Sequence, residues 1–120
     1  MERAISSFEK LGYVFGPVID DEARNVKLAF GENSGYRVEL VCPSDRTKAS
    51  PVDNYLKKTG PAPYHICYRT EDLDEKIKEL EGQGFRTVIA PEPAVAFDGR
   101  RVVFMMDLGL GLIEILEEGE

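Results

Sequence analysis

Two stretches decide the fold of this chain, because they share one pattern at a constant offset of 72 residues. They are Glu2-Arg3-Ala4-Ile5-Ser6-Ser7-Phe8-Glu9-Lys10-Leu11-Gly12-Tyr13 and Asp74-Glu75-Lys76-Ile77-Lys78-Glu79-Leu80-Glu81-Gly82-Gln83-Gly84-Phe85. Each predicts an amphipathic helix that stops at a glycine and leads into a strand. We expect the apolar helix residues to pack on sheets; they are Ile5, Phe8, Ile77 and Leu80.

A second shared pattern closes each half of the chain. Both Gly35–Val41 and Gly111–Leu116 read as a strand that follows a glycine and carries a central glutamate. Further short strands are expected near 13–18, 25–30, 85–89 and 101–106, and few helices accompany them, which indicates an α+β protein. The prediction is one domain of two modules, 1–42 and 63–118. A connector rich in Pro, Ser, Asp and Lys joins them at 43–62.

The two halves differ at their start. A strand at Tyr64–Arg69 precedes the second helix, and Asp72 with Glu75 forms a capping-box-like spacing before that helix. At the same offset, the counterparts of this strand and of the cap fall before Met1. We therefore expect the first module to lack its first strand through truncation or a misplaced start. The alternative is a natural N-terminus inside a frayed helix.

Composition narrows the classes of function. The chain has 120 residues, a hydrophobic share of 42% and a net charge of −7, from 22 acidic and 15 basic residues. This balance argues against nucleic-acid binding, which requires a basic surface. The sequence has no long apolar span and no secretory leader, so we expect a cytoplasmic protein that does not bind membranes. Cys42 and Cys67 lie in apolar runs, which favours packing as small hydrophobic residues over a disulfide.

Strand alternation brings together a candidate site. His65, Cys67 and Arg69 share one face of their strand, while Glu39 and Glu114 are each bracketed by aliphatic residues. A buried carboxylate needs a partner because desolvation of an unpaired charge is costly. One imidazole and two carboxylates could satisfy each other through a divalent metal, for which Zn, Mn, Fe, Co and Ni are suitable.

Two structural explanations of the same residues stay open. His65 could be a hydrogen-bonded residue of the core with no ligand role. Each glutamate could pair with a nearby arginine, since arginines stand at positions 37, 69, 100 and 101.

Several segments together resemble the vicinal oxygen chelate superfamily, which includes glyoxalase I, methylmalonyl-CoA epimerase, fosfomycin and bleomycin resistance proteins and extradiol dioxygenases. The resemblance is greatest to the glyoxalase-like and methylmalonyl-CoA-epimerase-like branch. The segments are Gly35–Val41, Ser50–Val52, Tyr64–Tyr68, Ala96–Phe104 and Gly111–Leu116.

The resemblance implies a fold and a ligand set. Members build paired βαβββ modules into a cupped, barrel-like sheet with a metal at its centre. Glu39, His65 and Glu114 fall on three of the four ligand positions, and the fourth has no residue here. The same likeness makes four residues candidates for substrate binding: Arg37, Arg69, Phe97 and Arg100. It also implies a homodimer.

The resemblance further implies an activity. In glyoxalase and epimerase types a carboxylate at the position of Glu114 is both metal ligand and catalytic base, and a proton leaves the carbon beside a metal-bound carbonyl oxygen. The epimerase type has a second carboxylate where Lys27 stands here. We therefore expect a metal-dependent isomerase or lyase of glyoxalase or methylmalonyl-CoA epimerase type. The alternative is a non-catalytic module that binds small molecules, as bleomycin resistance proteins do.

Overall fold

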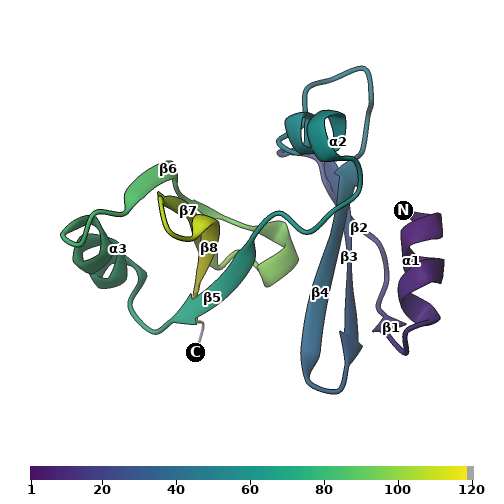
Figure 1. Ribbon diagram of the computed structural model, residues 1–120, viewed down its shortest axis with the longest axis horizontal. Helices are drawn as coiled ribbons and strands as arrows, with labels where there is room; N and C mark the ends of the chain where they lie inside the picture. Colours follow the sequence, from purple (N-terminus) through teal and green to yellow (C-terminus); the bar gives the residue numbers. More distant parts are fainter. Residues whose placement is uncertain (119–120) are drawn as a thin grey trace. The chain divides into compact units, whose positions relative to one another are not determined.

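The computed structural model describes residues 1–118, and the chain divides into two compact units. The units are Met1–Ala62 and Pro63–Glu120. Figure 1 shows that each unit contains a sheet and its own helices, which is the α+β class expected from the sequence. In the described part of the chain, no helix is long and apolar enough to cross a membrane.

The sheet of the first unit is built on one long central strand, β3 (Val26–Asn33). β4 (Tyr36–Pro43) pairs antiparallel with the whole of β3 on one edge. β1 (Val14–Phe15) and β2 (Ile19–Asp21) pair in succession with the other edge. The sequence predicted a strand near 13–18, and β1 lies within that range but is shorter, covering only Val14–Phe15. Pro17 lies between β1 and β2, and a proline has no N–H to give to a ladder.

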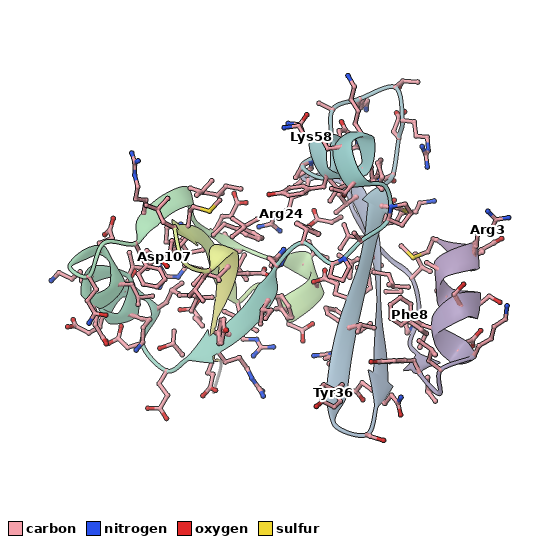
Figure 2. All side chains as sticks on the ribbon, viewed as in Figure 1. Arg3, Phe8, Arg24, Tyr36, Lys58 and Asp107 are labelled. Atoms are coloured by element: carbon pink, nitrogen blue, oxygen red, sulfur yellow. The ribbon has the colours of Figure 1, made fainter. Side chains whose placement is uncertain are left out.

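Two helices complete the first unit. Helix α1 (Glu2–Glu9) packs through Phe8, whose ring meets Tyr13 and Phe15 edge-on at centroid distances of 5.3 and 6.3 Å. Figure 2 shows Phe8 on the side of α1 that faces the strands. Helix α2 (Asp53–Thr59) lies within the predicted connector.

The loop before α2 is ordered by Asn25, which adopts a left-handed conformation with φ 55°. The side-chain amide of Asn25 donates to the carbonyl oxygens of Asp45, Lys48 and Ala49. Within the loop, the backbone N–H and hydroxyl of Thr47 donate to the Asp45 carboxylate, which lowers the pKa of Asp45. These contacts attach the connector to the β2–β3 turn.

The second unit follows the order expected for a complete module. Its elements are β5 (Ile66–Thr70), α3 (Leu73–Glu81), β6 (Arg86–Pro93), the 3-10 helix η1 (Val95–Phe97), β7 (Arg101–Asp107) and β8 (Gly111–Glu117). The strands lie in the order β5-β8-β7-β6. β5 runs parallel to β8, whereas β7 is antiparallel to both of its neighbours.

Helix α3 covers one face of this sheet. The predicted cap is confirmed: the Asp72 carboxylate accepts a hydrogen bond of 3.1 Å from the backbone N–H of Glu75. Ile77 and Leu80 pack on the sheet as expected. The buried core between the helix and the sheet consists of Leu73 of α3 and, from the sheet, Val103, Met105, Ile113 and Ile115.

An ion-pair network fastens the end of this sheet to the helix. The Arg101 guanidinium donates to the carboxylates of Glu117 on β8 and Asp74 on α3. These hydrogen bonds lower the pKa of Glu117 and raise the pKa of Arg101.

Candidate active site

The face of the second sheet opposite α3 carries the predicted chemistry. Ladder partners in a sheet point to the same side, and successive residues alternate. Because Ile113 and Ile115 face the helix, Glu114 faces the other way. Its partners are Cys67 on β5 and Phe104 on β7. His65, immediately before β5, and Arg69 share the face of Cys67.

His65 and Glu114 form a buried pair on this face. The Nε2 atom of His65 lies 3.0 Å from Oε1 of Glu114, and the two side chains are only 11% and 7% exposed. These two atoms lie at hydrogen-bonding distance, and the imidazole tautomer decides which of them donates. The structure therefore brings together two of the three residues that the sequence predicted as metal ligands.

Aromatic rings hold the imidazole in place. The rings of Tyr64 and Phe104 both meet it edge-on, at centroid distances of 4.4 and 5.3 Å. The other ring nitrogen, Nδ1, is buried and has no hydrogen-bond partner among residues 1–118. The imidazole is thus fixed by packing and by its single polar contact with Glu114.

The His65–Glu114 pair fits a divalent metal. Imidazole nitrogen and carboxylate oxygen are ligands of the metals expected from the sequence. Across residues 1–118, no three His, Cys, Asp or Glu side chains gather into a metal-binding group.

Glu39, the third predicted ligand, belongs to the first unit. It lies on β4, is half-buried and pairs in register with Phe30 on β3. The role of Glu39 as a metal ligand stays a prediction.

Three of the four candidate substrate-binding residues have other contacts. The Arg37 guanidinium lies over the Phe30 ring, 4.1 Å from its centroid. Phe97 is buried at 7% exposure, and Nε of Arg100 donates to the Phe97 carbonyl oxygen at 3.1 Å. Arg69 is exposed, and its side chain has no ion pair or hydrogen bond within the described chain.

The sequence did not predict the pocket that lies beside His65. Its volume is about 210 Å³. It is lined by residues around the starts of β5 and β8, which are Pro63, Tyr64, His65, Ile66, Tyr68, Leu110, Leu112 and Ile113. The alternation of Tyr64, Ile66 and Tyr68 was a signal that could have indicated it. The expectation that Cys67 packs as a small hydrophobic residue is wrong, because Cys67 is exposed. Neither cysteine forms a disulfide.

Comparison with known proteins gives three findings. Residues 1–104 match the family model of the glyoxalase/bleomycin resistance protein/dioxygenase superfamily. The chain is 29% identical over 108 residues to an ethylmalonyl-CoA/methylmalonyl-CoA epimerase of Cereibacter sphaeroides. The aligned region covers 88% of this chain and 78% of the relative. The chain is also similar to the crystal structure of methylmalonyl-CoA epimerase from Mycobacterium tuberculosis, with a TM-score of 0.82 and 26% identity, covering 99% of this chain and 81% of that one.

The fold has a further match in a crystal structure of a hypothetical protein from Bacillus halodurans. The TM-score is 0.86 at 23% identity, and the match covers 100% of this chain and 87% of that chain. At this level of identity the match supports the fold alone.

Proposed function

Since the chain belongs to the glyoxalase/bleomycin resistance protein/dioxygenase superfamily, we propose that it is an epimerase-type isomerase. Its substrate would be an acyl-CoA thioester of the malonyl type, and it would move the proton on the carbon next to the thioester carbonyl. The epimerase relatives support this reaction type and substrate. The observation that carries the proposal is the buried His65–Glu114 pair on the face of the second sheet opposite α3.

Glu114 has the properties of the catalytic base in this proposal. One of its oxygens contacts His65, and the carboxylate as a whole is almost fully buried, which keeps water away from the proton transfer. A divalent metal held by His65 and Glu114, with Glu39 as a further proposed ligand, would supply positive charge beside the carbonyl oxygen. Packing by Tyr64 and Phe104 orients the imidazole.

The simplest test is exchange of the α-proton. Return of a proton to the opposite face inverts the carbon, whereas return to the same face exchanges it with solvent. Exchange in D2O therefore reports base action irrespective of which face is reprotonated. We expect methylmalonyl-CoA to exchange with added Co²⁺, Zn²⁺, Ni²⁺ or Mn²⁺, and Glu114→Gln to slow exchange by about 10²- to 10⁴-fold. Mass spectrometry of the recovered thioester measures both.

A matched control separates the site from general effects of charge. Glu79→Gln removes a carboxylate from the exposed surface of α3 and should leave the exchange rate unchanged. No exchange above the protein-free rate under any of the metals would refute the proposed function. Equal rates for the wild type and Glu114→Gln would refute Glu114 as the base.

The second candidate function is non-catalytic binding of a small molecule. The pocket beside His65 favours it, because most of its lining residues are aromatic or aliphatic. Tight binding of the thioester without any α-proton exchange would support this alternative.

We also propose a homodimer formed at the edge of β4, and a cytoplasmic location. β8 is paired on both sides, whereas its counterpart β4 pairs only with β3 within the described residues. An open strand edge recruits another strand. Light scattering at several concentrations tests this assembly, and a monomer at all of them would contradict it. Fractionation of cells tests the location.

A further inference from the structure

Arg69 occupies a special position with respect to the proposed base. Cys67 is the direct partner of Glu114 in the β5–β8 ladder. His65 lies two residues before Cys67, and Arg69 lies two residues after it, on the same face of the strand. His65 and Arg69 are therefore diagonal neighbours of Glu114, one on each side.

Diagonal neighbours of this kind are separated by about 7–8 Å, which a long side chain can bridge. His65 does so and contacts Glu114 at 3.0 Å. Arg69 does not: within residues 1–118 its guanidinium has no ion pair or hydrogen bond, and the residue is exposed. Its own ladder partner is Leu116, a buried aliphatic residue that offers no charge. A cation without a partner thus lies beside the base, on the sheet face that carries the site.

We propose that Arg69 is the specificity-determining residue that binds the free carboxylate of the substrate. The inference rests on the proposed function, because it concerns a thioester whose acidic carbon lies between a carboxylate and the thioester carbonyl. A guanidinium binds a carboxylate through two parallel hydrogen bonds, which fixes the orientation of the bound group. With the carboxylate held at Arg69, the adjacent carbon is directed toward the Glu114 side of the face.

The same contact assists removal of the proton. Loss of the α-proton places a second negative charge next to the substrate carboxylate. A guanidinium bound to that carboxylate offsets the repulsion between the two charges. Arg69 is therefore expected to favour thioesters that carry the carboxylate over neutral thioesters of the same shape.

The chain offers a matched control in Arg86. Arg86 is also exposed and unpaired in the described chain, and its ladder partner Met106 pairs in turn with Leu112 on β8. This places Arg86 on the same face as Glu114. In the strand order β5-β8-β7-β6, however, it lies three strands away from Arg69.

The test compares methylmalonyl-CoA with its methyl ester, in which the carboxylate is neutral but the α-carbon stays acidic. Exchange of the α-proton in D2O is measured for the wild type, Arg69→Met, Arg69→Lys and Arg86→Met. For the acid, Arg69→Met should lower kcat/KM by about 10- to 100-fold, through a higher KM from the lost contact and a lower kcat from the lost charge compensation. Arg69→Lys should restore part of that loss. Arg69→Met should leave the ester unaffected, and Arg86→Met should leave both substrates unaffected.

Calorimetric titration of the acid and of the ester into the wild type and Arg69→Met gives a second measurement that does not need turnover. Binding of the acid that depends on Arg69, without exchange, would uphold the inference and refute the proposed function. Exchange of the acid at equal rates in the wild type and Arg69→Met would refute the inference alone. Equal losses of activity toward the acid and the ester in Arg69→Met would show a structural role for Arg69 and would also refute the inference. A wild type that neither binds the acid nor exchanges its α-proton would refute both the inference and the proposed function.

Discussion

The buried His65–Glu114 pair can be measured by a double-mutant cycle. His65→Leu leaves a carboxylate that is 7% exposed without its partner, and Glu114→Leu does the same to an imidazole that is 11% exposed. Removing one partner of a buried pair costs roughly 3–5 kcal/mol, because the remaining polar group stays desolvated. The double variant leaves neither group. We therefore expect its loss to be smaller than the sum of the single losses by about 1–3 kcal/mol.

The assay is urea unfolding in the presence of a chelator, so that no metal contributes. Unfolding is followed by far-UV circular dichroism and by tyrosine fluorescence, which is usable because the chain has five tyrosines and no tryptophan. The Lys76–Glu79 pair is a useful control. Its N–O distance of 3.2 Å is similar, but its side chains are 38% and 50% exposed. Exposed pairs couple by about 0.2–1 kcal/mol. Additive losses at His65 and Glu114 would refute the reasoning that burial makes this pair strong.

Three further predictions concern the scaffold. Gly31→Ala should lower the free energy of unfolding by about 1–3 kcal/mol, because a Cβ there would lie 2.5 Å from Phe15 ring atoms. In a Phe15→Leu background, urea unfolding should show a smaller loss. Asp72→Ala should cost about 1 kcal/mol and Asp72→Asn much less, as thermal melts would show, since only the first removes the cap. Hydrogen bonds from Arg101 lower the pKa of Glu117 in the folded state. The ionised carboxylate therefore stabilises the fold at pH values above its unfolded pKa, and this stabilisation is lost as the pH falls through the folded pKa. The Tm difference between wild type and Glu117→Gln should therefore disappear in acid.

The sequence predicted those parts of the fold that depend on local signals. The repeated helix pattern and the spacing of Asp72 and Glu75 act over a few residues, and the structure confirms the capped helix α3. The strand expected near 13–18 is shorter in the structure, because Pro17 separates β1 from β2. The extra strand β2 gains its hydrogen bonds from β3, which is a tertiary partner that a local pattern does not specify.

The site was predictable as far as the sequence shows which polar side chains are buried. A histidine and a glutamate on inward strand faces need a partner, and the structure supplies each with the other. The contacts of Arg37 and Arg100 were not predictable, because a ring face and a backbone carbonyl become partners only after folding. For the same reason the sequence did not separate Arg69 from the other candidate arginines.

The proposed chemistry depends on the register of β5 against β8. A slip of one residue would turn His65 and Arg69 to the opposite face, away from Glu114. The backbone resists such a slip at the far end of the strand, where the N–H of Glu118 donates to the Thr70 carbonyl oxygen at 2.8 Å. Just beyond it, Leu73 is buried in the core and fixes the start of α3. The residues that keep the register are thus distinct from those that face the base, so a change at Arg69 leaves the contacts that position Glu114 in place.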